Sequence, residues 1–348
     1  MTAVRPSAPP VEVERWADGA AWDAFVAGAG DSTVAHRWAW TAVVPAVYGH
    51  QVLPLAAVRG GALAGVLPLV MVRSRLFGRS LVSMPYLDYG GVCSDGDRGA
   101  EHALVGAAVE LARSGGAKLE LRHLTERPLD LPASLRKVTM TLDLRGGEDA
   151  VWKRIRSGRR GQVRKARKNG LVATWHGTEA LGPFYRILAA NMRDLGSPVH
   201  RRQFFASVVD RLGSDARIIL VRDGTEPVGA GLALIHRDRI MLPWVSSLRA
   251  SFALRPNQLL YWETFRYGVE RDCRLFDFGR SSWDSGTFES KRQYGAEPEQ
   301  LFWHRYPSEG TDGDEGADRL EWATRIWRRL PLPVANVVGP MVRGGLTN

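Results

Sequence analysis

The sequence has only two cysteines, Cys93 and Cys273, among its 348 residues. Two cysteines cannot build a disulfide framework, and these two do not have the spacing of metal ligands. The eight histidines are scattered singly along the chain, so we expect no metal site. Both thiols are expected to be buried in a protein of the reducing cytoplasm.

Long uncharged apolar runs are also missing. The best candidate, residues 53–72, is interrupted by Arg59 and by glycines and prolines, whereas a helix that crosses a bilayer needs about 18 apolar residues in a row. Residues 1–10 carry three prolines and lack the apolar core of a signal peptide, so we expect a disordered leader. These absences predict a cytoplasmic protein.

Charge of one sign is in excess. Lysine and arginine outnumber aspartate and glutamate by 47 to 37, which gives a net charge of +10 and a pI near 10.0. Such a balance favours an anionic partner: nucleic acid, a nucleotide-linked substrate or an anionic membrane surface. Residues 151–170 alone hold nine basic residues and no acidic one. We expect a pair of helices with one basic face there, either binding phosphates or simply facing solvent.

Two stretches of the sequence share one plan. Residues 55–69 and residues 220–234 each consist of an apolar run, a charged turn with glycine and a second apolar run, which predicts a β-hairpin. A helix precedes each hairpin, and an amphipathic helix and a strand follow it. This ordered recurrence predicts two copies of one α/β unit, at residues 11–146 and 147–306.

The last part of the chain has a different composition. Residues 307–318 are rich in glycine and acidic residues and predict a linker. Residues 319–348 form a basic tail, with an amphipathic helix expected at 319–330. Such a helix either lies on a membrane surface, here the inner face of the membrane, or packs on its own domain or a second subunit. We expect a monomer or a dimer.

Five segments, taken in order, resemble a known family. The chain resembles the FemAB-like group within the GNAT-type acyltransferase superfamily, and most of all the FemAB-like proteins associated with exosortase and exopolysaccharide gene sets. The resemblance covers about residues 22–306. The segments are RSRLFGRSLVSMPYLDYGG at 73–91, RKARKNGL at 164–171, NQLLYW at 257–262, FDFGR at 276–280 and SGTFESKRQYG at 285–295.

The resemblance implies an α/β (α+β) fold of two tandem GNAT-like domains, each a mixed, mostly antiparallel sheet flanked by helices. It also implies transfer of an aminoacyl or acyl group to an amine. In the Fem ligases the donor is aminoacyl-tRNA and the acceptor is a cell-wall precursor. Their functional lysine stands in a Phe-Lys pair, which reads Ser290-Lys291 here. The helical-hairpin insertion that tRNA-binding members often carry is not visible in this sequence.

The chemistry of amine acylation suggests roles for particular residues. Aminolysis of an ester or thioester passes through an anionic tetrahedral intermediate. Lys291 is the candidate to stabilise that charge or the donor phosphates, and Tyr261 is either a proton relay or a core aromatic residue. Asp277 and Arg280 close the last strand as a positioning pair or a structural ion pair. The other candidates for substrate binding are Arg75, Tyr86, Tyr89 and Thr287.

The donor is the remaining question. A CoA-binding GNAT domain grips the pyrophosphate with a glycine-containing turn before a helix. The matching positions are Ser251, Leu254 and Pro256, which lack the basic residue and both glycines, and proline removes an N–H donor. We therefore expect aminoacyl-tRNA as co-substrate and no bound cofactor; acyl-CoA is the alternative donor, and a non-catalytic nucleic-acid or polysaccharide-assembly protein is the third hypothesis. The residues expected to bind tRNA phosphates are Arg159, Arg160, Arg164, Lys165, Arg167, Lys168 and Arg255.

Overall fold

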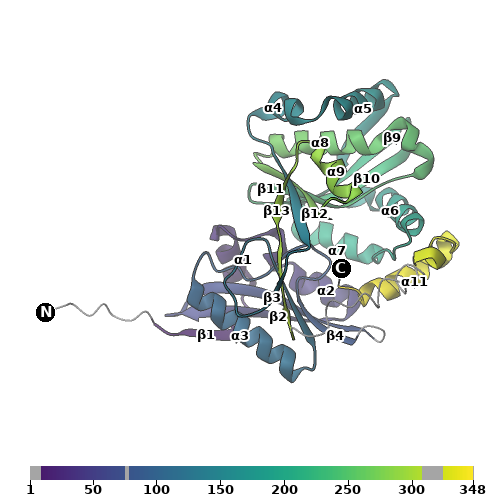
Figure 1. Cartoon of the computed structure of the whole chain (residues 1–348). Helices are drawn as coiled ribbons and strands as arrows, with labels where there is room; N and C mark the ends of the chain where they lie inside the picture. Colours follow the sequence, from purple (N-terminus) through teal and green to yellow (C-terminus); the bar gives the residue numbers. More distant parts are fainter. Residues whose placement is uncertain (1–8, 75–77, 308–323, 348) are drawn as a thin grey trace.

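The computed structural model describes residues 9–74, 78–307 and 324–347. Figure 1 shows two halves, each built around one sheet. The first half contains the elements β1 (Val11–Arg15), α1 (Gly19–Gly28), η1 (Val34–His36), α2 (Trp40–Tyr48), β2 (Gln51–Arg59), β3 (Ala62–Ser74), β4 (Gly78–Ser83), α3 (Arg98–Ser114), β5 (Lys118–His123) and β6 (Ala133–Ser134).

The second half and the tail follow in the chain. Their elements are β7 (Lys137–Asp143), α4 (Gly147–Arg154), α5 (Ser157–Lys168), β8 (Leu171–His176), η2 (Thr178–Ala180), α6 (Leu181–Leu195), α7 (Arg202–Leu212), η3 (Gly213–Asp215), β9 (Ala216–Asp223), β10 (Glu226–His236), β11 (Arg239–Ser247), η4 (Arg249–Leu254), α8 (Pro256–Glu270), β12 (Leu275–Ser282), α9 (Gly286–Arg292), β13 (Glu297–Gln300), β14 (Phe302–Tyr306) and α11 (Leu332–Gly344).

Both sheets follow one plan. In the first, β1 to β4 pair antiparallel with their neighbours, and β4 then pairs in parallel with β5. In the second, β8 to β11 pair antiparallel, and β11 then pairs in parallel with β12. A parallel pair needs a crossover connection, which α3 supplies in the first half and α8 in the second. The two mixed, mostly antiparallel sheets expected from the sequence are therefore confirmed.

The turns of both expected hairpins depend on glycine. Gly60 and Gly61 join β2 to β3 with φ of +57° and +83°, and Gly224 lies between β9 and β10 with φ of +56°. Positive φ has little steric cost only for glycine. The turn residues in the sequence thus fix where each hairpin reverses.

The halves exchange one strand each. The first sheet has the order β1-β2-β3-β4-β5-β14-β6, and the second has the order β13-β7-β12-β11-β10-β9-β8. β14 therefore returns to the first sheet from the end of the second half. β7 precedes residue 147 but pairs with β12 and β13, and its Val138, Met140 and Leu142 are buried in the second core. A division of the chain at 146/147 separates β7 from the sheet that it joins.

A shared core lies between the halves. It includes Trp40 of α2, Phe184 of α6, Phe204 of α7 and Trp303 of β14. Helices α6 and α7 lie on the face of the second sheet that is turned toward the first half, whereas α4, α5 and α8 cover the opposite face (Figure 1). Because both halves bury apolar side chains in one cluster, this burial stabilises their contact.

The C-terminal part packs back onto the molecule. Of the helix expected at 319–330, residues 324–327 are helical, and residues 319–323 lie outside the described residues, as do positions 308–318 of the expected linker and residues 1–8 of the expected leader. α11 packs against α6, and the carbonyl of Gly344 accepts a hydrogen bond from Nε2 of His50 at 2.7 Å. In the described part of the chain, no helix has the length and apolar character needed to cross a membrane.

Candidate active site

The second sheet opens along β12. This strand pairs with β11 only from Leu275 to Asp277, and its pairing with β7 shifts register between Asp277 and Arg280. Gly279 lies in this shift with a φ of +72°, and a Cβ at this position would lie 2.7 Å from Oδ2 of Asp88. Only glycine fits there. The backbone after Asp277 leaves the regular ladder, which frees its carbonyl groups for other donors.

Lys291 binds these carbonyl groups. Its Nζ donates hydrogen bonds to the carbonyl oxygens of Gly279 at 2.8 Å and of Arg280 at 2.9 Å. Burial lowers the pKa of Lys291 from 10.5 to about 8, although the carboxylates of Asp88 and Asp277 oppose this shift. An ammonium has three N–H donors, and the contacts among the described residues use two. Lys291 therefore lies in the junction between the halves and keeps one donor that these contacts leave unused.

Asp88 of the first half holds Arg280 of the second. Oδ2 of Asp88 accepts a hydrogen bond from the backbone N–H of Arg280 at 2.9 Å, and Oδ1 lies 3.3 Å from Nε of the same arginine. The guanidinium groups of Arg280 and Arg122 lie over the ring of Trp303, at 5.4 and 4.6 Å from its centroid. The expected pair of Asp277 and Arg280 does not form, because the bulge turns the two side chains toward different partners.

Asp277 joins the halves from inside the protein. It is fully buried, and its carboxylate accepts hydrogen bonds from Oγ1 of Thr139 at 2.7 Å, the N–H of Gly279 at 2.7 Å and Nη1 of Arg239 at 2.8 Å. The hydroxyl of Tyr89 also donates to it. Four donors satisfy the carboxylate, as a buried charge requires. The side chains of Asp277 and Tyr89 thus contact each other.

Tyr261 lies in an aromatic cluster of the second core. Its ring centroid is 5.3 Å from those of Phe278 and Tyr294. Burial raises the pKa of Tyr261 to about 12, with a smaller opposing effect of Arg159. Among the described residues, no hydrogen bond joins its hydroxyl to Lys291. The geometry therefore favours the core role over the proton relay.

In the described structure, the remaining substrate-binding candidates Tyr86 and Thr287 hydrogen-bond to partners other than Lys291. Tyr86 is buried, and its hydroxyl donates to the carbonyl of Gly344 at 3.0 Å, so the C-terminal segment covers it. Thr287 is exposed in the first turn of α9, where its hydroxyl lies 3.0 Å from that of the capping residue Ser285. Arg75 lies outside the described residues.

The basic helix α5 packs against α8 and reaches the helix that carries Lys291. Nη2 of Arg159 donates to the hydroxyl of Ser290 at 2.9 Å, and its guanidinium lies 5.3 Å from the ring centroid of Tyr294. The serine that replaces the aromatic residue of the Fem pair thus anchors an arginine in this chain. In addition, Nη2 of Arg167 donates to Glu263 of α8 at 2.8 Å. The basic run is therefore tied to the candidate active site.

The other basic side chains of α5 and of the turn before α8 either are exposed to solvent or have a buried nitrogen without a hydrogen-bond partner. Arg164, Lys165, Arg167 and Lys168 are exposed along α5. In the described structure, the buried Nε atoms of Arg159, Arg160 and Arg255 have no hydrogen-bond partner. Arg255 precedes α8 with a φ of +70°, and Pro256 occupies the first turn of that helix. An unpaired arginine nitrogen is costly to bury.

A cavity of about 360 Å³ lies between the halves, separate from Lys291. Tyr89 and Arg239 line it and also contact Asp277, so the cavity and the Lys291 site share one carboxylate. No pattern in the sequence predicted this cavity. Other lining residues include Ser32, Thr125, His236, Arg274 and Glu299.

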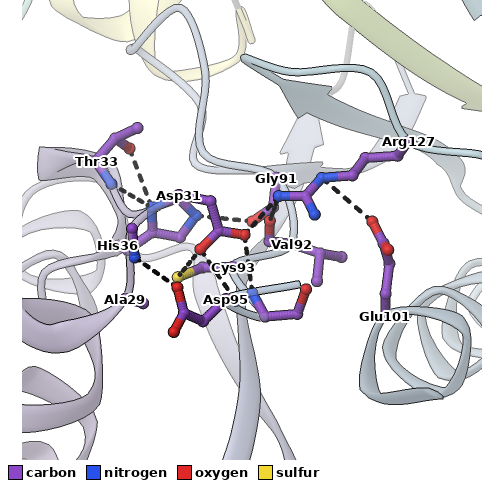
Figure 2. A network of polar contacts seen from close by, with 12 residues as sticks. Ala29, Asp31, Thr33, His36, Gly91, Val92, Cys93, Asp95, Glu101 and Arg127 are labelled. Carbon is purple, nitrogen blue, oxygen red and sulfur yellow. Dashed lines mark hydrogen bonds and ion pairs between the residues drawn. The ribbon is translucent and has the colours of Figure 1, made fainter. Parts of the chain in front are cut away.

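A polar network fixes the wall of this cavity, and Figure 2 shows Asp31 beside Arg127 at its centre. Asp31 accepts hydrogen bonds from Nη2 of Arg127 at 2.5 Å and from the N–H of Ser94 at 3.1 Å. Burial acts to raise the pKa of Asp31, but these bonds leave it below its usual value. Burial lowers the pKa of His36, whose neutral ring donates from Nε2 to the carbonyl of Gly91 at 2.9 Å. The loops that carry Asp31 and His36 are therefore held in place by hydrogen bonds within the protein.

Metal chemistry has no candidate site in the described part of the chain, where no group of three or more histidine, cysteine or acidic side chains could hold an ion. Cys93 and Cys273 are both buried and free, as expected.

Asp88 contributes to the site but was not among the residues predicted from the sequence. The available signal was a charged residue between Tyr86 and Tyr89 in an otherwise apolar segment.

Comparisons with known proteins agree with the fold. Residues 153–292 match the acetyltransferase (GNAT) domain family. No curated protein matches the sequence. FemX is similar in structure, with a TM-score of 0.64 and 15% identity over 84% of this chain and 96% of that chain.

Two further solved structures are similar. One is the C-terminal domain of a putative lysylphosphatidylglycerol synthetase from Agrobacterium fabrum, with a TM-score of 0.56 and 13% identity over 88% of this chain and 95% of that one. The other is L-PGS from Bacillus licheniformis, with a TM-score of 0.57 and 12% identity over 90% and 98%. At these identities the likeness concerns the fold. The chain has a FemAB-like tandem GNAT fold, and residues 153–292 within it match the GNAT acetyltransferase domain.

Proposed function

We propose that the protein is an acyltransferase that moves an aminoacyl group from aminoacyl-tRNA to an amine of a cell-envelope precursor. The observation that carries this proposal is the position of Lys291, whose ammonium lies at the open end of β12 beside Asp88 and Arg280. FemX and the lysylphosphatidylglycerol synthetase domain, whose names associate them with aminoacyl transfer, support it through the shared fold.

The reaction needs one negative charge stabilised and one proton moved. The amine nitrogen attacks the ester carbonyl, a C–N bond forms, and the C–O bond to the tRNA ribose breaks. The remaining N–H of Lys291 stabilises the oxyanion of the tetrahedral intermediate. With a pKa of about 8, Lys291 also gives a proton to the leaving ribose oxygen and recovers one from the attacking amine, because proton transfer is most efficient near the working pH.

The basic surface supports tRNA as the donor. Exposed lysines and arginines of α5 lie on one helix, which is joined to α9 by the bond from Arg159 to Ser290. The turn before α8 has Leu254 and Pro256 in place of the glycines of a CoA site, with Arg255 between them. A long anionic polymer suits such a surface through many phosphate contacts.

Acyl-CoA is the second candidate donor. The match of residues 153–292 to the acetyltransferase (GNAT) domain favours it. The unpartnered Nε atoms of Arg159, Arg160 and Arg255 would suit a pyrophosphate as well as a tRNA backbone. A rise in melting temperature on addition of acetyl-CoA would favour this donor, whereas no shift leaves tRNA preferred.

The decisive experiment supplies tRNA charged with a labelled amino acid together with amine acceptors. We expect the wild-type protein to move label from tRNA to acceptor, and Lys291→Ala to slow transfer by about 100-fold or more, since it removes an oxyanion donor. Lys118→Ala is the matched control, because Lys118 is exposed on β5 in the first half. Equal rates for wild type and Lys291→Ala would overturn the assignment.

Salt dependence tests the basic surface separately. We expect Lys165→Gln and Lys168→Gln together to weaken tRNA binding and to reduce the slope of log affinity against log salt by about one per lysine. Arg98→Gln, an exposed cation on α3, should leave the slope unchanged. A slope that responds equally to both changes would mean that α5 does not bind the tRNA.

A further inference from the structure

α11 packs against the protein through its small residues. Ala335 and Gly339 are buried, and a Cβ on Gly339 would lie 3.2 Å from the backbone nitrogen of Val199. That distance is tighter than ordinary van der Waals contact, so glycine permits the helix to approach this closely. The face of α11 that packs against the protein thus consists largely of small residues.

Four large apolar residues of α11 are exposed to solvent. The exposed fractions are 44% for Val334, 63% for Val337, 38% for Val338 and 69% for Met341. Positions separated by three, four and seven residues lie on one face of a helix. We name these four residues the α11 apolar face. A surface helix normally buries such residues, so a contiguous exposed set marks an interaction surface.

The surroundings of this face are cationic. Residues 324–347 contain four arginines and no acidic residue. Arg328 and Arg329 are exposed, and Nη2 of Arg328 donates to the carbonyl of Leu195 at 3.4 Å. The side chain of Leu195 is itself 54% exposed. Apolar and positively charged groups thus occur together at this edge of the molecule.

We propose that the α11 apolar face docks on the surface of a membrane that contains anionic lipids. Apolar side chains enter the boundary between headgroups and acyl chains, and the arginines bind lipid phosphates. A second copy of the chain fits less well, since a symmetric dimer would bring the same arginines face to face. The 13 residues of α11 span about 20 Å, which is shorter than a bilayer, so the helix lies in the interface.

Docking would also place the candidate active site near the lipid surface. Arg343 at the end of α11 donates from Nε to Nε2 of His200 at 2.9 Å, and the following segment accepts a hydrogen bond from Arg122 through the carbonyl of Thr347 at 2.9 Å. Arg122 lies over Trp303 together with Arg280. On the proposed function, on which this step rests, the arrangement suits an acceptor that is anchored in a membrane.

Co-sedimentation of the full chain with vesicles tests the docking. We expect binding to vesicles of equal parts phosphatidylglycerol and phosphatidylcholine, weaker binding to phosphatidylcholine alone, and weakening by salt. Val337→Asp with Met341→Asp should reduce binding at least about tenfold, because two carboxylates replace apolar groups at the interface. Val172→Asp is the matched control, since Val172 is 59% exposed on the edge strand β8.

The outcomes separate the possible occupants. Equal vesicle binding by wild type and the double variant overturns the proposal. The proposal is also overturned if, without lipid, the wild type sediments as a dimer and the double variant as a monomer, because the face then binds a second copy of the chain. Unchanged thermal unfolding of the double variant confirms that it is folded. Transfer to a dissolved amine should survive in that variant, so failure of docking and failure of the proposed activity are distinguishable.

Discussion

The carboxylate of Asp88 accepts a hydrogen bond from the backbone N–H of Arg280 at 2.9 Å, across the junction of the two halves. Its other oxygen lies 3.3 Å from Nε of the same arginine. One residue of the first half therefore holds the irregular end of β12 in the second. The carbonyl groups that bind Lys291 belong to that same end.

Replacing Asp88 should loosen this junction. We expect Asp88→Ala to lower the free energy of unfolding by about 1–3 kcal/mol, because it leaves a part-buried N–H and a guanidinium without their acceptor. Asp88→Asn keeps one acceptor oxygen and should cost less. Urea unfolding of the three proteins measures the difference. Stability of Asp88→Ala equal to that of the wild type would mean that Arg280 is held by other contacts.

Gly279 offers a test of the backbone itself. Gly279→Ala forces a side chain into a positive φ and against Oδ2 of Asp88, so we expect a loss of about 1–3 kcal/mol in unfolding free energy. Gly106→Ala is the matched control: Gly106 lies inside α3 with no neighbouring atom within 4 Å. That change should raise stability by about 0.5–1 kcal/mol. Equal effects of the two substitutions would contradict a strained bulge.

Local signals in the sequence were sufficient for the hairpins and for the order of helices and strands. Gly60, Gly61 and Gly224 specify their turns directly, and each hairpin pairs residues that are close in the chain. The crossover helices follow from the rule that parallel strands need a long connection. The duplicated plan could therefore be predicted from residues alone.

Contacts between distant segments could not be predicted in this way. β7 pairs with β12 across more than a hundred residues, and no local pattern in 137–143 specifies this partner. For the same reason Asp277 and Arg280 were expected to pair, although Arg239 and Asp88 reach them from elsewhere. Strand propensity describes a strand's faces, whereas its partner depends on tertiary packing.

The exchanged strands make the halves interdependent. A fragment of residues 1–146 would lack β14, which lies between β5 and the edge strand β6 of the first sheet, and would carry β7 without its partners. We expect this fragment to show no cooperative unfolding, whereas the full chain should unfold in one main transition. Circular dichroism during urea titration measures both. A stable, cooperative fragment would show that β14 adds little to the first sheet.

The pKa of Lys291 predicts how stability depends on pH. The folded state holds this pKa at about 8, below its value of 10.5 in an unfolded chain. Below pH 8 both states bind the proton, and the folded state bears the cost of a buried charge. Between about pH 8 and 10.5 only the unfolded state keeps the proton, so the stability of the wild type relative to Lys291→Met should rise, by roughly 3 kcal/mol at most.

The same pKa predicts the pH dependence of transfer. If the ammonium form of Lys291 stabilises the oxyanion, single-turnover transfer from charged tRNA should fall as pH rises through about 8. Spontaneous hydrolysis of the tRNA ester grows in base, so each rate is corrected by a reaction without protein. Lys291→Arg keeps its charge at these pH values and should lose the fall. A wild-type rate that instead increases through pH 8 would assign Lys291 the role of a neutral base, with the oxyanion stabilised by other donors.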